Sequence, residues 1–350
     1  MQPNVNLCSL AIAVPDHLIR QSEAVAVATA LFADKLNGFR RLASVFDNAG
    51  IRERYSARPL SWFYEPHGWA ERMEAFADGA SKLFVDVANR AINQAGMTAR
   101  DVDCVVFVST TGFSTPSIEA RVATRMGFRA DVVRVPVFGL GCAAGVSGFA
   151  IASRLAASQP GSKVLFVAIE LCSLAFRLDE ATPVNVVASA LFGDGAAACI
   201  LTTERPGLAS IESTGEHLFE DTLGIMGWSV DNTGLGIMLA QSLPPFVKEK
   251  VGPAVIGILK RNRLNLSDIG RFICHPGGAK VIDALEGALG MEQGALNQER
   301  EVLADYGNMS SPTVLFVLDR AVRTGLPNRS AMLAMGPGFS TSCVTLRRAA

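Results

Sequence analysis

The chain has 350 residues, of which 49% are hydrophobic, and a formal net charge of −1 at pH 7. A net charge near zero argues against nucleic acid or an anionic membrane surface as the main partner. The seven cysteines show neither CxxC pairs nor the Cys/His spacing of metal sites, which indicates a reducing compartment without disulfides or zinc. There is no signal-peptide pattern and no apolar run near the ~18 residues of a membrane span, so we expect a cytoplasmic protein without an integral membrane segment.

Apolar runs and helical spacing predict alternating strands and helices in the first two hundred residues. Strands are predicted at 7–14, 104–109, 132–137, 163–170 and 196–202, and helices at 80–95, about 118–127, 143–158 and 185–192. The runs at 104–109 and 163–170 are continuously apolar, as buried parallel strands are. Residues 20–75 give a mixed pattern with a basic bias from Arg40, Arg41, Arg52, Arg54 and Arg58. We interpret that bias as a solvated face, and a patch for a phosphorylated ligand is the alternative.

The pattern restarts after a junction at about 205–245. Helices are predicted at 245–262, with a kink at Gly252-Pro253, at 279–289 and at 312–324, and strands at 271–274, 330–335 and 343–347. We therefore expect two domains, at 1–210 and 211–350. Helices that alternate with buried strands predict an α/β protein whose parallel-rich sheets carry helices on their faces.

Regular spacings indicate that the second domain repeats the first. Cys142 lies 21 residues before the next predicted strand, and Asn308 lies 22 residues before its own next strand. Ser109 lies 33 residues before Cys142, and His275 lies 33 residues before Asn308. Cys142 and Asn308 are therefore predicted to occupy equivalent positions in two related halves. Function in such sheets collects at the carboxyl ends of the strands, where all these residues fall.

Cys142, His275 and Asn308 make a candidate catalytic set. Cys142 follows a predicted strand and opens a helix, whose unpaired N–H groups and dipole stabilise a thiolate nucleophile. His275 and Asn308 can both donate hydrogen bonds to a developing enolate or carbonyl oxygen. This chemistry suits acyl transfer from a thioester followed by decarboxylative condensation, and it needs no metal. Each residue also has a structural interpretation, as a packing cysteine, a core histidine and a helix cap.

Five motifs in order resemble the type III polyketide synthases, the chalcone synthase-like group of the thiolase superfamily. They are G-C-A-A-G at 141–145, L-F-G-D-G-A-A-A at 191–198, H-P-G-G at 275–278, Y-G-N-M-S-S at 306–311 and G-P-G-F at 336–339. The resemblance extends over roughly residues 5–348. It implies a thiolase-like fold with a duplicated, five-layered αβαβα architecture, made as a homodimer. It also implies acyl-CoA and malonyl-CoA as substrates, with no cofactor.

The resemblance assigns a role to each member of the set. Cys142 carries the starter acyl group and the growing chain, and it is held as a thiolate paired with an imidazolium at His275. His275 and Asn308 bind the malonyl carbonyl and promote decarboxylation. Phe192 is the gatekeeper between the coenzyme A tunnel and the cavity, with an ordinary core residue as the alternative.

Further site residues follow from the same resemblance. The cavity wall is implied to contain Ile237, Cys172 and Ala175 and the loop Gly336, Pro337 and Gly338, while Thr115 reaches into the cavity of the partner subunit. Contacts to coenzyme A are implied for Arg41, Arg54, Gly278 and Ser310, with a helix cap as the alternative for Ser310. Ser44 and Asn48 stand where basic residues are usual in the family.

The wall residues point to the substrate. Ile237, Cys172 and Ala175 make the wall less aromatic and less polar than in the plant enzymes, and residues 226–231 resemble the bacterial branch. We therefore expect a fatty acyl starter that is extended with malonyl-CoA and cyclised to a pyrone or resorcinol, as by alkylpyrone and alkylresorcinol synthases. One alternative is a ketoacyl synthase of fatty acid synthesis, which requires an acyl carrier protein. The others are a thioester hydrolase and a catalytically silent acyl-binding or scaffold protein.

Overall fold

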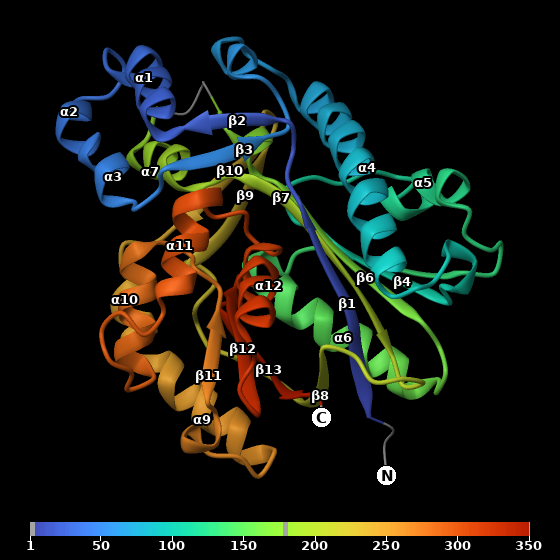
Figure 1. Ribbon diagram of the computed structural model, residues 1–350. Helices are drawn as coiled ribbons and strands as arrows, with labels where there is room; N and C mark the ends of the chain where they lie inside the picture. The colour runs from blue at the N-terminus through green and yellow to red at the C-terminus, as the bar shows by residue number, and fades with distance from the viewer. Residues whose placement is uncertain (1–3, 178–180, 350) are drawn as a thin grey trace.

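The computed structural model describes residues 4–177 and 181–349, in which one sheet of nine strands runs through the molecule (Figure 1). The strands of this sheet are, in spatial order, β11 (Arg271–Cys274), β12 (Arg329–Gly336), β13 (Ser340–Arg348), β8 (Ala209–Leu218), β1 (Val5–Ala13), β7 (Asp194–Thr202), β6 (Val164–Leu171), β4 (Cys104–Val108) and β5 (Val133–Val137). Two small sheets pair β2 (His17–Arg20) with β3 (Glu53–Ser56) and β9 (Met226–Asp231) with β10 (Gly234–Leu239).

Helices precede, separate and follow these strands. The α-helices are α1 (Gln21–Phe32), α2 (Phe39–Leu42), α3 (Ser44–Asn48), α4 (Trp69–Gln94), α5 (Ile118–Met126), α6 (Ala144–Ser158), α7 (Pro183–Leu191), α8 (Leu243–Phe246), α9 (Gly252–Arg261), α10 (Ala279–Ala288), α11 (Asn297–Tyr306) and α12 (Thr313–Thr324). Short 3₁₀ segments used below are η1 (Leu60–Tyr64), η3 (Gly141–Ala143) and η4 (Cys172–Ala175).

The strand order confirms that the chain contains two related halves. In the first half β4 runs parallel to β6, β6 pairs antiparallel with β7, and β7 pairs with β1. In the second half β11 runs parallel to β12, β12 pairs antiparallel with β13, and β13 pairs with β8. The two sets join where residues 5–7 of β1 pair with residues 209–211 of β8. The fold is the expected thiolase-like duplication.

Three apolar clusters show how the layers pack. Helix α4 covers one face of the first-half strands, where Phe84 of the helix lies in the same apolar cluster as Leu165 of β6. Helices α6 and α12 lie between the two sets of strands, where Phe149 and Phe316 pack in a single core. Helices α9 and α10 cover the outer face of the second half. The order helix, sheet, helix pair, sheet, helix gives five layers (Figure 1).

The structure differs from the sequence-based expectation in several regions, which include helix α11 at Asn297–Tyr306, where no helix was predicted. Residues 205–245, expected as a junction, contain β8, β9 and β10, and β8 lies in the middle of the sheet. Residues 17–64, for which no element was predicted, contain the β2–β3 pair and helices α1 to α3. The helix expected at 80–95 also begins earlier, at Trp69.

A π-helical turn over Val247–Val251 joins α8 to α9 and directly precedes Gly252-Pro253, where a kink was predicted. Proline has no N–H and its ring crowds the preceding turn, so regular α-helical bonding cannot continue through it. No helix in residues 4–177 or 181–349 is long and apolar enough to cross a membrane.

Candidate active site

Cys142, His275 and Asn308 all line one cavity of about 610 Å³. Cys142 lies in η3 at the start of α6, His275 directly follows β11, and Asn308 lies in the turn between α11 and α12. All three side chains are at least nine-tenths buried. The duplicated topology therefore brings together three residues that are far apart in the sequence, as their spacing predicted.

The turn that carries Cys142 is held by close backbone contacts. Gly141 has a φ of +51°, and a Cβ there would lie 2.5 Å from Cδ of Pro337, so only glycine fits. The Gly141 N–H donates to Thr110 Oγ1 over 3.0 Å, and the Cys142 thiol donates to Ser310 Oγ over 3.4 Å. These contacts aim the sulfur at the residues that precede α12.

Burial disfavours charge on both Cys142 and His275. Burial raises the pKa of Cys142 to about 12, against a smaller lowering from the Ser310 hydrogen bond, and burial lowers the pKa of His275 to about 3. Burial of each group, taken alone, therefore opposes the ion pair that the family resemblance implies. A thiolate is favourable here only if its proton moves to His275 at the same time, since each charge then offsets the burial of the other.

His275 and Asn308 offer free hydrogen-bonding capacity to a ligand. Neither ring nitrogen of His275 has a hydrogen-bond partner within the described part of the chain. Asn308 Nδ2 donates to the Gly277 carbonyl over 3.1 Å, and its Oδ1 accepts the Ser310 N–H over 2.8 Å. These two bonds fix the orientation of the amide and leave its second N–H for another acceptor. Both side chains can therefore donate to one substrate oxygen.

Glu170, at the end of β6, was not assigned a role from the sequence. It is fully buried, and its carboxylate accepts hydrogen bonds from the N–H groups of Thr110 and Thr111 and from the hydroxyls of Thr111 and Ser311. Burial raises the pKa of Glu170, and these bonds lower it. The network ties the loop after β4 to the start of α12, next to Cys142. An acidic residue at the end of an apolar strand was the available signal.

The outer part of the large cavity is basic. Among its lining residues the only cations are Arg41 and Lys280, which are both exposed, and none is a carboxylate. Gly278, Ser44 and Asn48 also line it. Arg41 and Gly278, for which a contact to coenzyme A was predicted, both line this cavity, and that contact stays a prediction. Lys280 was missed, although its place in the first turn of a helix directly after H-P-G-G was a usable signal.

Arg54 does not lie at this entrance, contrary to the expectation that it contacts coenzyme A. Its side chain is only 4% exposed, and its guanidinium donates to three backbone carbonyls at the end of α7. Burial lowers its pKa to about 10. With its donors directed at these carbonyls, Arg54 cannot also reach a phosphate in solvent. Arg52, close to Arg54 in the sequence, forms an ion pair with Asp305. Arg52 and Arg54 therefore both have partners within the protein.

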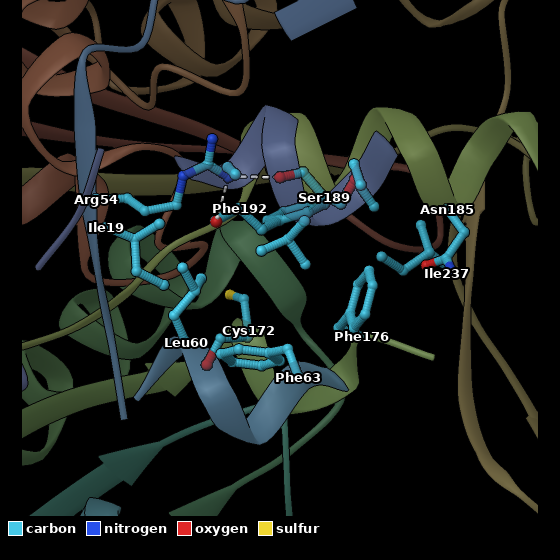
Figure 2. Close-up of a pocket in the computed structure, with 15 residues that line it drawn as sticks. Ile19, Arg54, Leu60, Phe63, Cys172, Phe176, Asn185, Ser189, Phe192 and Ile237 are labelled. Atoms are coloured by element: carbon cyan, nitrogen blue, oxygen red, sulfur yellow. Dashed lines mark hydrogen bonds between the residues drawn. The ribbon is translucent and has the colours of Figure 1, made fainter. Parts of the chain in front are cut away.

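A second, smaller cavity of about 80 Å³ lies against Phe192 (Figure 2). Its wall contains Phe63, Phe176, Cys172 and Ile237, so it is largely apolar. Phe192 lines both cavities and therefore forms a shared wall between them. Cys172 and Ile237, which the resemblance assigned to the cavity wall, line this smaller cavity and not the one that contains Cys142. Residues of α1 and η1 also line it, which the sequence did not suggest.

The remaining predicted residues lie outside the walls of both cavities. Ala175 is buried in η4, and Thr115 is exposed in the loop before α5. Gly336 packs against the turn that carries Cys142, and a Cβ on Gly336 would lie 2.4 Å from the Leu140 carbonyl oxygen. Pro337 also lies close to Gly141 in this turn, so residues 336–338 pack against the backbone on either side of Cys142. The residues described here contain no group of three His, Cys, Asp or Glu side chains that could hold a metal.

Comparison with known protein families gives matches along almost the whole chain. The N-terminal domain of the chalcone and stilbene synthases matches residues 4–205, and the C-terminal domain of the same family matches residues 210–349.

Similar proteins include two curated bacterial relatives and one solved structure. A 1,3,6,8-tetrahydroxynaphthalene synthase from Streptomyces peucetius subsp. caesius is 35% identical, over 96% of this chain and 91% of the relative. An alpha-pyrone synthesis polyketide synthase-like protein from Mycobacterium tuberculosis is 31% identical, over 95% of this chain and 88% of the relative. The crystal structure of 1,3,6,8-tetrahydroxynaphthalene synthase from Streptomyces coelicolor A3(2), a bacterial type III polyketide synthase, matches with a TM-score of 0.93 at 28% identity, covering 98% of this chain and 99% of that one.

Proposed function

Because the chain belongs to the chalcone and stilbene synthase family and is a type III polyketide synthase, we propose that Cys142, His275 and Asn308 carry out its condensation reaction. The observation that supports this assignment is the convergence of the three side chains on one cavity. The family match favours this acyltransferase over the fatty acid ketoacyl synthase and over a silent acyl-binding protein.

The proposed reaction begins with transfer of a starter acyl group from its coenzyme A thioester. Cys142 Sγ attacks the thioester carbonyl, its proton passes to His275 and then to the leaving coenzyme A thiolate, and a new thioester forms on the enzyme. Malonyl-CoA then loses carbon dioxide. Donors from His275 and Asn308 stabilise the enolate oxygen that results, and the enolate carbon attacks the acyl carbon on Cys142. The bond from that carbon to Sγ breaks and Cys142 leaves as the thiolate, so the extended chain is now a coenzyme A thioester, which returns to Cys142 by the same acyl transfer before the next extension. Repeated extension gives a chain that cyclises.

We further propose that the starter is a fatty acyl-CoA and that the product is a pyrone or resorcinol. The apolar wall of Cys172, Ile237 and the two phenylalanines supports this choice. Each CH₂ buried against such a wall contributes about 0.8 kcal/mol. The name of the mycobacterial relative refers to alpha-pyrone synthesis, which is consistent with this product class. The basic entrance at Arg41 and Lys280 suits the phosphates of coenzyme A.

The homodimer implied by the family resemblance is also a proposal. Three large apolar side chains near the open edge of β5 support it, since Phe113, Val133 and Phe138 are each more than half exposed. A second copy would cover these side chains, and the nearby Thr115 loop of one subunit would then contact the surface of the other subunit. Size-exclusion chromatography with light scattering measures this, and a monomeric wild-type protein at micromolar concentration would contradict it.

The experiment that tests the function is product analysis from malonyl-CoA with a series of acyl-CoA starters, from acetyl to palmitoyl. We expect pyrones or resorcinols by mass spectrometry, with the highest yield from long starters and no need for an acyl carrier protein. Free acid without a new carbon–carbon bond would indicate a hydrolase instead. If malonyl-CoA alone gave products at the same yield as malonyl-CoA with a long acyl-CoA, the proposal of a fatty acyl starter would be wrong. Ile237→Phe should narrow the wall and shift the preferred starter to shorter chains.

A further inference from the structure

We propose that Arg54 is a positioning residue that fixes Phe192 as the wall between the two cavities and so sets how much of the starter chain the smaller cavity accepts. This inference rests on the proposed function, because it needs an acyl chain that extends past Phe192. It replaces the contact to coenzyme A that the sequence suggested for Arg54. The geometry around its guanidinium, and the packing of its aliphatic stem, support the new role.

The guanidinium of Arg54 holds the backbone of the segment that carries Phe192. Nη1 donates to the carbonyl oxygens of Ser189 over 2.7 Å and of Phe192 over 3.0 Å (Figure 2). Nη2 donates to the Ala190 carbonyl over 2.8 Å and also to Gln21 Oε1. Three of the four backbone carbonyls from Ser189 to Phe192 therefore accept hydrogen bonds from one side chain.

These carbonyls are the ones that a helix end leaves without partners. Helix α7 ends at Leu191, so the carbonyls of residues 188 to 191 have no bond within the helix ladder. The Phe192 N–H donates to the Ala188 carbonyl over 3.0 Å, and the Asn308 N–H donates to the Leu191 carbonyl over 2.8 Å. Arg54 donates to the other two, those of Ser189 and Ala190, and Gln21 Nε2 also donates to the Ala190 carbonyl over 3.3 Å. Its positive charge also lies at the negative end of the helix dipole, which favours this position for a cation.

The aliphatic stem of Arg54 fills a corner where two backbone segments run close together. A Cβ on Gly193 would lie 3.2 Å from Arg54 Cβ and 2.5 Å from the Tyr306 carbonyl oxygen. A Cβ on Gly307 would lie 3.5 Å from Arg54 Cβ. The Gly193 N–H in turn donates to the Asn308 carbonyl over 3.0 Å. Arg54 thus packs against the bridge that links Phe192 to Asn308.

Only a guanidinium can make this set of contacts from one position. It presents several donors in a planar fork, whereas a lysine presents all its donors from one atom and cannot reach carbonyls on successive residues together. Loss of the fork leaves buried carbonyls unpaired, and the end of α7 must move to find other partners. Phe192 moves with it. The boundary between the two cavities then shifts, and the preference among starters of different length changes.

The test is a double-mutant cycle with Arg54→Lys and Phe192→Ala, in which the ratio of kcat/KM for palmitoyl-CoA and hexanoyl-CoA is measured. We expect Arg54→Lys alone to change this ratio about tenfold, within the range of coupling found for residues in contact. In the Phe192→Ala background the same substitution should leave the ratio unchanged, because Arg54 acts through the Phe192 ring. An unchanged ratio in the single variant, or an equal change in both backgrounds, would overturn the proposal.

Two further variants separate this role from a general loss of structure. Arg90→Lys alters an exposed arginine on α4 that also donates to a backbone carbonyl, that of Ile12, and it should leave the ratio unchanged. If Arg54→Lys does not fold, Gln21→Met removes the acceptor of Arg54 Nη2, together with the donor to the Phe46 and Ala190 carbonyls, and should change the ratio in the same direction. A uniform loss of kcat for every starter would show a structural role only. Failure of wild-type enzyme to form product from any starter would instead remove the proposed function, and this inference with it.

Discussion

The two halves of the molecule share a strand order, yet they place different side chains at equivalent positions. Cys142 precedes α6 in the first half, and Asn308 precedes α12 in the second. Ser109 follows β4, and His275 follows β11. Each half therefore has one position after a strand and one before a helix, called its corner below. The corners of the two halves match in topology, and their side chains determine what each corner can do. A nucleophile on one half and hydrogen-bond donors on the other divide the proposed reaction into acyl loading and malonyl activation.

The halves also differ at the outer edge of these strands. In the first half β4 pairs on that side with β5. In the second half β11 lies at the edge of the sheet, and the N–H of Cys274 donates to the buried carboxyl of Glu299 over 3.1 Å. The segment before α12 does not extend the sheet but forms a two-residue bridge to Phe192 in the first half. At this position the first half therefore has strand β5, and the second half has a backbone bridge to the first half.

The largest effect is expected from the nucleophile of the first half. Cys142→Ala should lower product formation at least about a thousandfold, because no acyl-enzyme can form, while carbon dioxide release from malonyl-CoA persists through the second half. Intact-protein mass spectrometry measures loading, and labelled malonyl-CoA measures decarboxylation. Cys199→Ala removes another buried thiol, in β7, and should leave both unchanged. A loaded acyl group on Cys142→Ala would contradict the division between the halves.

The second half should show the reverse pattern. Asn308→Ala removes one donor to the enolate oxygen and should lower decarboxylation about a hundredfold, the usual cost of losing such a donor. Acyl loading on Cys142 should remain measurable by mass spectrometry. Asn297→Ala, at the exposed start of α11, is the matched control. Equal carbon dioxide release from wild type and Asn308→Ala would show that the corner does not act as proposed.

The contact between the two halves offers a third test. Gly145 of α6 lies against α12, and a Cβ there would lie 2.1 Å from the Ser311 carbonyl oxygen. Gly145→Ala should therefore destabilise the fold by about 3 kcal/mol in urea unfolding, because the two helices must separate. Gly257→Ala in α9 meets only the end of the Arg261 side chain, at 3.8 Å, and should stabilise by up to about 1 kcal/mol. Stabilisation by both substitutions would mean that α6 and α12 are not closely packed.

The smallest effect concerns the corner that His275 shares with Ser109 by symmetry. Burial lowers the pKa of His275 to about 3, below its ordinary value of 6.5, so the unfolded chain binds a proton more readily than the native chain. Between pH 6.5 and about 3 the contribution of His275 to stability is lost as pH falls, by about 1.4 kcal/mol per pH unit. His275→Ser, which copies the other half, should remove this slope. Urea unfolding at pH 7 and pH 5.5 compares the two, and parallel losses would contradict the burial of a neutral imidazole.

Much of the first-half architecture could be predicted because its strands are buried on both faces. Such strands appear in the sequence as continuous apolar runs, and those at 104–109 and 163–170 were placed within two residues. Strand β8 was missed because only Ala209 of its ten residues is buried, and its polar residues, such as Glu212 and His217, leave no apolar run. Its place in the sheet depends on pairing with β13, more than a hundred residues away. Local composition does not contain that information.

The candidate site shows the same limit. Cys142, His275 and Asn308 could be found because duplication fixes their spacing, and their convergence followed from topology. Arg54 could not be placed, because charge in a sequence does not reveal whether its partner is a phosphate or a helix end that lies 135 residues further along the chain. The smaller cavity was only partly foreseen for a related reason. Its α1 wall belongs to short elements whose burial depends on packing against α7.

The seam between β1 and β8 has a consequence for dissecting the molecule. Because β1 pairs with β7 on one side and with β8 on the other, the opening strand of the chain is completed only by residues beyond 208. A fragment that stops before Ala209 would present an unpaired strand edge at Val5 together with the uncovered apolar side of α6, features that promote self-association. The two repeats are therefore not separable modules, and an ancestral single repeat with this layout would have needed a second copy of itself to close the same seam.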